Sequence, residues 1–196
     1  MNRKTALETV NRVAIFVDVQ NMWYCTKNSK GKNSKLNYGN LLKFIANGRD
    51  VAVAEAFLML KEEVDANKFA NMLYMNGFDV KKKWMEFRDK SSGRENIVSW
   101  DVGMTIEMIK WMNKVDTICL VSGSGAFVDV VEYMKNFCRI EVVGYQKFTS
   151  NLLKKIATDF VEIDQQSNTD LFMTEGIGDP DLVKEVPAPL TQEKDA

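Results

Sequence analysis

Apolar runs of strand length alternate with helical patterns along most of this chain, and this alternation limits the folds that it can adopt. The first run, Val13 to Val19, is rich in β-branched residues and ends beside polar residues, which is typical of a strand buried on both faces. The same patterns predict further strands at residues 51–58, 78–84, 116–121, 139–145 and 160–163, and helices at 37–45, 65–75, 101–112, 127–137 and 150–157. This order predicts an α/β fold with a mainly parallel central sheet and helices on both faces.

Histidine is absent from all 196 residues, and this absence narrows the chemistry. It excludes a histidine general base, Ser-His and Cys-His nucleophilic systems, and zinc sites that need imidazole. Catalysis would have to rest on carboxylates, lysines, tyrosines or a metal held by oxygen. The net charge is −1, so nucleic acid would have to be bound by local basic clusters rather than by a global positive field.

The sequence carries no sign of membrane insertion or export. No apolar run approaches the ~20 residues that span a bilayer, and residues 1–8 lack the apolar core of a secretion signal. The three cysteines, Cys25, Cys119 and Cys138, have no metal-ligand spacing and are expected to be reduced. We therefore expect a cytoplasmic protein with no membrane partner.

Composition divides the chain into three parts. Residues 1–11 are expected to be an N-terminal extension, 12–164 a single domain, and 165–196 an acidic, flexible tail that glycines and prolines interrupt. Within the domain, the polar stretches 28–35 and 88–94 are predicted to be loops.

Polar residues follow two of the predicted strands. Asp18 and Asn21 come at and after the end of the first strand, and Ser122 to Ala126 come after the fourth. In open parallel sheets, ligands bind beyond the carboxyl ends of the strands, at the point where the strand order reverses. If these two strands are neighbours, their polar ends form one site.

These residues, taken in order, resemble the NYN/LabA-like branch of the PIN-fold ribonucleases. The markers are Asp18-x-x-Asn21, the Asp101 to Met104 segment that opens a helix, Ser122-Gly123-x-Gly125-x-Phe127, and Ala157 to Phe160 before the last strand. The resemblance implies a Rossmann-like PIN fold with strand order 3-2-1-4-5. It also implies a Mg²⁺- or Mn²⁺-dependent ribonuclease, in which clustered carboxylates hold the metal.

Asp18 and Asp101 are the candidate catalytic and metal-binding residues. Carboxylates are the ligands that Mg²⁺ prefers, and a bound ion makes a water acidic enough to attack a phosphodiester. Each aspartate also has a structural interpretation: Asp18 as the cap of a turn, and Asp101 as the N-cap of its helix. Glu107, Asp129 and Asp159 could supply a further carboxylate, and each is also explained as a surface or capping residue.

The chain departs from the family pattern at the fourth strand. The family usually has aspartates where this chain has Ser124 and Ala126, and it often has Lys-Gly before the position of Asp101, where this chain has 98–100, Val-Ser-Trp. Two lost carboxylates should weaken metal binding, so the site is expected to hold one ion weakly, or none. The resemblance then implies a pseudo-nuclease with weak or lost cleavage that still binds RNA.

Several residues are candidates for binding RNA phosphates. Gly123 and Gly125 allow close backbone approach, and the N–H groups at the start of the following helix could face a phosphate. The expected set is Asn21, Ser122, Gly123, Ser124 and Gly125, with Lys27, Lys30, Lys32 and Lys35 in a loop beside the cleft. Lysines 81–83, Arg88, Lys90 and Arg94 form a second cluster, and aromatic residues such as Trp23, Tyr24 and Trp100 could stack on bases if exposed. The lysines at 81–83 are equally explained as protection of an edge strand.

The partner expected from these residues is RNA, with a homo-oligomer or a protein partner as further possibilities. The alternative function is a non-catalytic protein-interaction or scaffold module that keeps only the PIN fold. A small-molecule phosphatase or nucleotide binder at the same switch point is a third reading, but no Walker-type or GxGxxG motif follows any predicted strand.

Overall fold

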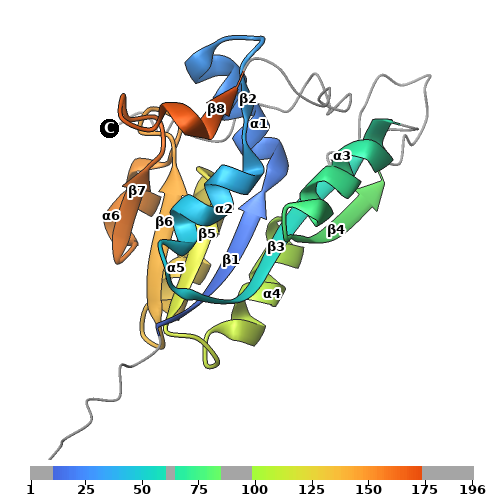
Figure 1. Ribbon diagram of the computed structural model, residues 1–196. Helices are drawn as coiled ribbons and strands as arrows, with labels where there is room; N and C mark the ends of the chain where they lie inside the picture. Colours follow the sequence, from blue (N-terminus) through green and yellow to red (C-terminus); the bar gives the residue numbers. More distant parts are fainter. Residues whose placement is uncertain (1–10, 61–64, 85–98, 174–196) are drawn as a thin grey trace, which may run out of the picture.

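A six-stranded, wholly parallel sheet forms the centre of the computed structural model, which describes residues 11–60, 65–84 and 99–173 (Figure 1). The strand order is β4-β3-β1-β5-β6-β7, and a separate two-stranded sheet pairs β2 with β8. The strands are β1 (Arg12–Asp18), β2 (Lys35–Leu36), β3 (Asp50–Leu60), β4 (Asp79–Trp84), β5 (Thr117–Val121), β6 (Arg139–Gly144), β7 (Asp159–Glu162) and β8 (Phe172–Met173). The helices are α1 (Val19–Lys30), α2 (Tyr38–Ala46), α3 (Asp65–Met75), α4 (Asp101–Trp111), α5 (Val128–Met134) and α6 (Asn151–Ile156), with short 3-10 turns at Gly125–Phe127 and Thr169–Leu171.

The α/β class and the strand order are confirmed. The five predicted strands at 13–19, 51–58, 78–84, 116–121 and 139–145 correspond to β1, β3, β4, β5 and β6, and they stand in the predicted order 3-2-1-4-5. The short strand predicted at 160–163 is β7, which adds to the far edge. β1 therefore lies inside the sheet, between β3 and β5.

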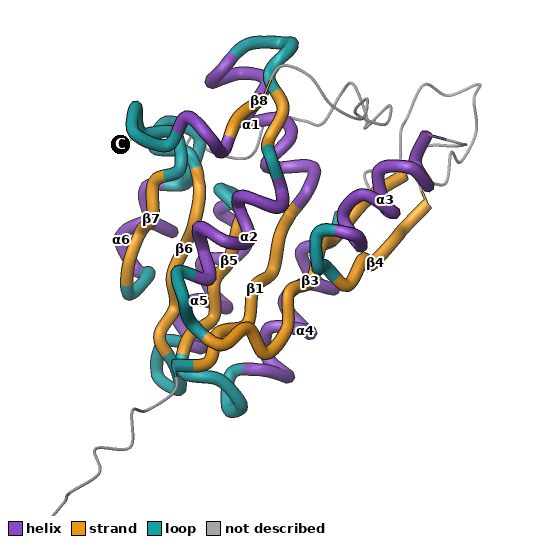
Figure 2. Tube along the Cα trace, in the orientation of Figure 1, coloured by secondary structure: helices purple, strands orange, loops and turns teal. Residues whose placement is uncertain are grey.

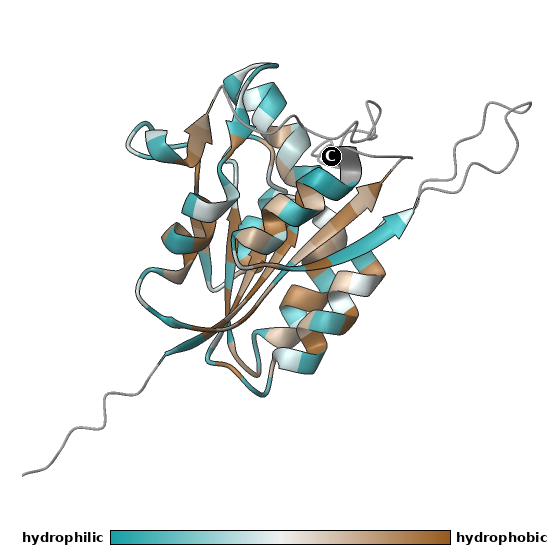
Figure 3. Cartoon of the chain, turned by 45° about the vertical axis from the view of Figure 1, so that its right-hand side comes forward, coloured by the Kyte–Doolittle hydropathy of each residue, from teal (hydrophilic) through white to brown (hydrophobic). Residues whose placement is uncertain are grey.

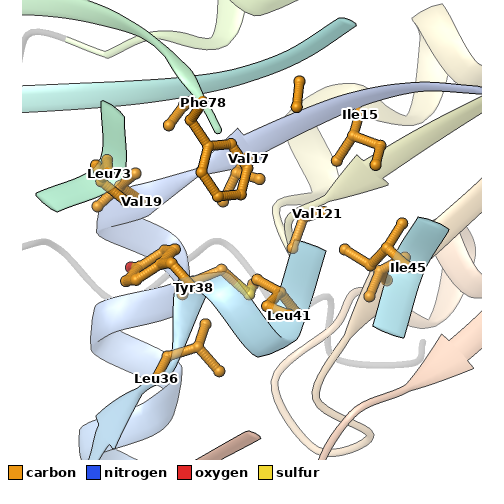
Figure 4. Packing of buried hydrophobic residues seen from close by; sticks show 14 of the residues in the cluster. Ile15, Val17, Val19, Leu36, Tyr38, Leu41, Ile45, Leu73, Phe78 and Val121 are labelled. Carbon is orange, nitrogen blue, oxygen red and sulfur yellow. The ribbon is translucent and has the colours of Figure 1, made fainter. Parts of the chain in front are cut away.

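Both faces of the sheet are covered, which explains why β1 is apolar without alternation. Val13, Ile15 and Val17 point into a core shared with α1, α2 and α3, as the close view in Figure 4 shows for Ile15 and Val17. The intervening side chains of β1, Ala14 and Phe16, point into a second core under α4, α5 and α6. Since a strand buried on both faces has no solvent side, its polar residues can appear only at its ends.

Helix α1 was not predicted, and the loop expected over 28–35 begins only at Gly31 (Figure 2). The second half of the helix contains three residues of low helix propensity, Thr26, Asn28 and Ser29. Tertiary packing stabilises the helix, because Val19, Met22 and Cys25 recur at helical spacing and are buried against the sheet. Lys27 and Lys30 therefore lie on the last turn of a helix, and not in a loop.

The ordered part of the chain extends beyond the domain end that we expected at residue 164. Leu171 is buried, Phe172 and Met173 pair with β2, and Leu171 accepts a backbone hydrogen bond from Asn37 at 2.8 Å. The segment 165–173, expected to belong to a flexible tail, is therefore packed on α1 and α2. Residues 1–10 of the expected extension 1–11, the loop at 88–94 and the tail from 174 lie outside the described residues. No helix among the described residues is long and apolar enough to cross a membrane.

Candidate functional site

Asp18 joins the ends of β1 and β5. It is the last residue of β1 and the N-cap of α1: one carboxylate oxygen accepts a hydrogen bond from the backbone N–H of Asn21 at 3.1 Å. The other oxygen accepts a hydrogen bond from the hydroxyl of Ser122, also at 3.1 Å. Ser122 follows β5 directly and is fully buried. Asp18 is thus a cap, as its structural interpretation held, and it also lies at the predicted switch point.

A second set of hydrogen bonds fixes the turn after β5. The side-chain oxygen of the buried Asn21 accepts from the backbone N–H of Gly123 at 2.8 Å, and the hydroxyl of Ser122 accepts from the N–H of Ser124 at 3.2 Å. The backbone N–H groups of Gly123 and Ser124 are therefore used inside the protein. Gly123 and Ser124 were expected to bind phosphate. Their backbone N–H groups donate to Asn21 and Ser122 instead.

Gly123 has a packing reason to be glycine. A Cβ atom at this position would collide with the backbone carbonyl of Phe148, and the carbonyl of Gly123 accepts a hydrogen bond from the N–H of Ser150 at 3.0 Å. The turn after β5 is thereby held against the loop that follows β6. This close approach of two backbones explains Gly123 without a ligand.

Asp101 is the first residue of α4 and not its N-cap. The N-cap is Trp100, which makes no capping hydrogen bond with its side chain. The capping interpretation of Asp101 is therefore wrong. Among the described residues its carboxylate has no hydrogen-bond or ion-pair partner, and it is only partly exposed.

The two aspartates influence each other. Burial raises the pKa of Asp18 from 3.8 to about 6, and this effect exceeds the lowering caused by the hydrogen bonds from Asn21 and Ser122. The negative charge of Asp101 raises the pKa of Asp18 further, so the two carboxylates lie close enough to repel each other. A site with these properties is one that a cation or a proton would stabilise.

The donor set fits one hydrated divalent ion and no more. Mg²⁺ is commonly held by one or two carboxylates while it keeps several waters, which suits Asp18 and Asp101. Within the described ranges, no group of three or more Asp, Glu, Cys or His residues could hold a metal ion. The other candidates are elsewhere: Glu107 pairs with Lys110 at 2.8 Å, and Asp159 is at the amino end of β7, paired with Arg139.

Trp100 anchors the start of α4. Its ring packs edge-on against Phe57 with centroids 5.2 Å apart, and a Cβ at Gly103 would lie 2.7 Å from the ring. On the ring lies the ammonium of Lys83, 4.1 Å from the centroid, which also donates to the carbonyl of Ser99 at 3.0 Å. Trp100 is therefore a packed residue rather than the exposed stacking surface that we expected. It fixes the helix that carries Asp101.

Four lysines were expected in a loop beside the site, but Lys27 and Lys30 lie on the last turn of α1 and Lys35 begins β2. Lys30 donates to the carbonyl of Asp164 at 3.1 Å and lies 4.8 Å from the ring centre of Phe172. It stands at the far end of α1, about 18 Å along the helix from Asp18 at 1.5 Å per residue. Lys27 lies 5.9 Å from the ring centre of Trp23, and Lys32 is exposed after the helix. Trp23 and Tyr24 are themselves packed against the core.

Phe148 and Lys147 lie beside the site and were missed. Phe148 packs its carbonyl on Gly123 and its ring edge-to-face on Tyr24, with centroids 6.5 Å apart. Lys147 is exposed, with its ammonium 5.7 Å from the Phe148 ring centre. The signal is their place in the sequence, because both residues lie in the loop after β6, the strand next to β5.

Comparison with known proteins gives a consistent set of matches. The family model of the NYN domain matches residues 12–164. The Low amplitude and bright protein LabA of Synechococcus elongatus is 29% identical over 131 residues, an alignment that covers 64% of this chain and 68% of that protein. The crystal structure of a protein of unknown function from Vibrio parahaemolyticus superposes with a TM-score of 0.72 at 28% identity, covering 85% of this chain and 98% of the other.

Proposed function

Since the chain belongs to the NYN domain family, a PIN-like, RNA-related nuclease family, we propose that it binds RNA at the Asp18 site with weak or lost cleavage. The observation that carries this proposal is the network in which Asp18 joins β1 to β5 while Asp101 stands beside it. The polar ends of β1 and β5 meet at this point, and two aspartates remain beside them.

The first support is the cost of keeping Asp18. Asp18 is only partly exposed, and a desolvated carboxylate with a pKa raised to about 6 is unfavourable at neutral pH. Asn at this position could accept the same backbone hydrogen bond. Perturbed acids of this kind, placed at a switch point, are typical of functional sites. Asp18 and Asp101 are the residues that would hold Mg²⁺ or Mn²⁺, which would supply an acidic water and offset charge on a phosphate.

The second support concerns cleavage. The hydroxyl of Ser124 accepts a hydrogen bond from the backbone N–H of Ala126 at 3.3 Å and so stabilises the turn. Neither residue carries a charge that could hold a metal ion. The chain has no histidine to act as a base. Fewer carboxylates also mean less repulsion of a phosphate, so a cleft of this kind favours binding over hydrolysis.

A gain-of-function experiment tests this directly. Ser124→Asp and Ala126→Asp restore the carboxylates of the family pattern at partly exposed and exposed positions, so both should be tolerated. We expect the double variant to gain Mn²⁺-dependent cleavage of single-stranded RNA and to bind RNA more weakly in EDTA. Asp159→Asn, at the opposite edge of the sheet, is the matched control. A wild type that binds no RNA in low salt, or a double variant with unchanged metal-free affinity, would contradict the proposal.

A protein-interaction role is the second candidate, and a specific observation favours it. Large apolar side chains are exposed on α4, on α5 and in the turn after α5, namely Val102, Ile106, Ile109, Tyr133 and Phe137. The three on α4 recur at i, i+4 and i+7 and so share one side of the helix. If Ile106→Asp changes a complex or an oligomer while RNA binding is absent, this function replaces the first.

A further inference from the structure

The sheet order places two lysines at equal distances on either side of Asp18. β4 lies two strands from β1 in one direction, and β6 lies two strands away in the other (Figure 1). Neighbouring strands are about 4.8 Å apart, so each outer strand is about 10 Å from β1. Lys83 stands at the carboxyl end of β4, and Lys147 follows the carboxyl end of β6. A cation therefore flanks the acidic pair on each side along one edge.

Lys83 differs from its neighbours on β4, a strand that Figure 3 colours as hydrophilic beside the apolar centre of the sheet. Lys81 is used in ion pairs with Glu55 and Asp79, at 3.3 and 2.8 Å. Lys83 has only the neutral partners Trp100 and the Ser99 carbonyl among the described residues, so its charge is not neutralised there. Its ammonium lies beside the first turn of α4, 3.8 Å from where a Cβ at Gly103 would be.

Lys147 is placed in the same way on the other side. Phe148 fixes its own loop against Gly123, one residue from the Ser122 that bonds Asp18. Lys147 is exposed, and its contact among the described residues is with the ring of Phe148. The Phe148 ring is packed against the core as Tyr24 is, so this loop offers a single strand an ammonium that can neutralise a phosphate.

We propose that single-stranded RNA crosses the carboxyl edge of the sheet from β4 to β6, with Lys83 and Lys147 each holding a backbone phosphate on opposite sides of Asp18. The inference rests on the proposed function and adds the path and the two contacts. The two lysines are about 20 Å apart by strand spacing. That span takes at most about six nucleotides, because phosphates of one strand are at least about 3.4 Å apart along its axis.

The test measures fluorescence anisotropy of labelled oligouridylates with the full chain in EDTA, over a series of salt concentrations. Lys83→Gln and Lys147→Gln should each weaken binding of an oligomer of about eight nucleotides by about threefold to tenfold, and each should reduce the salt slope by about 0.7. Lys82→Gln is the control for Lys83, since it is exposed on the opposite face of the same strand. Lys135→Gln, at the end of α5, is the control for Lys147.

The length of the RNA gives a second readout. A dinucleotide that occupies the Asp18 site cannot reach both lysines, so neither substitution should change its affinity by more than twofold. The path is wrong if Ser124→Asp lowers RNA affinity while both lysine variants bind like wild type, and the proposed function then stands. If wild type binds no oligomer, or Ser124→Asp has no effect, the proposed function itself fails.

Discussion

Replacing Asp18 by Asn should stabilise the protein at neutral pH. Asn has the same shape, and its side-chain oxygen can keep the hydrogen bond from the backbone N–H of Asn21. Its amide can meet the hydroxyl of Ser122, which then acts as acceptor. What the substitution removes is a partly buried negative charge that Asp101 also disfavours.

The magnitude follows from the pKa. Because the pKa of Asp18 in the folded protein, about 6, lies above its ordinary value of 3.8, the folded state binds this proton more tightly than the unfolded chain. The resulting contribution to stability is complete below pH 3.8 and is lost as the pH rises through about 6. At 1.36 kcal/mol per tenfold change, the loss at pH 7 approaches about 3 kcal/mol. Rearrangement of the Ser122 hydroxyl reduces the expected gain of the Asn variant to about 1–3 kcal/mol.

Urea unfolding between pH 4 and pH 8 measures this gain. The free energy of unfolding of Asp18→Asn should exceed that of wild type at pH 7, and the two should converge near pH 4. Asp129→Asn, on an exposed part of α5, should match wild type within about 0.5 kcal/mol at every pH. Mn²⁺ should stabilise wild type and leave Asp18→Asn unchanged. An Asn variant that is less stable than wild type at pH 7 would refute the burial of an unfavourable charge at this site.

One further substitution and one truncation test how the domain is built. Gly103→Ala should destabilise the protein by about 1–3 kcal/mol in urea unfolding, because its Cβ would lie 2.7 Å from the Trp100 ring; helix propensity alone predicts a gain of about 1 kcal/mol, and observing that gain would show that the ring does not confine this helix. A chain that ends at Asp164 should melt about 5–10 °C below one that ends at Met173, since it lacks the buried Leu171; equal melting temperatures would show that 165–173 adds nothing to the domain.

The sheet and the position of the site could be predicted because the strands are local patterns and the family resemblance implied their order. A strand buried on both faces must be apolar throughout, so β1 and β5 were visible as runs, and their polar ends marked one edge. Asp18 and Ser122 are 104 residues apart, yet parallel pairing brings them to 3.1 Å. The strand order made the two strand ends neighbours, and the hydrogen bond between the side chains is a finding of the structure.

What could not be predicted depends on partners distant in the sequence. Helix α1 is held by burial of Val19, Met22 and Cys25 and not by its propensity, so its sequence looked like a loop. The pairing of β2 with β8 involves two residues on each side, too few to give a periodic signal. Gly123 was assigned to phosphate binding because nothing in the local sequence shows that its backbone N–H donates to Asn21.

Anomalous scattering from a crystal soaked in Mn²⁺ at pH 8 tests the central claim most directly. At that pH the Asp18 carboxylate is ionised, since its pKa is about 6. We predict one peak within about 2.1–2.2 Å of an oxygen from Asp18 and one from Asp101, with its remaining ligands supplied by water. A Mn²⁺ ion bound elsewhere while this position stays empty at saturating concentration would contradict a two-carboxylate site at the meeting of β1 and β5.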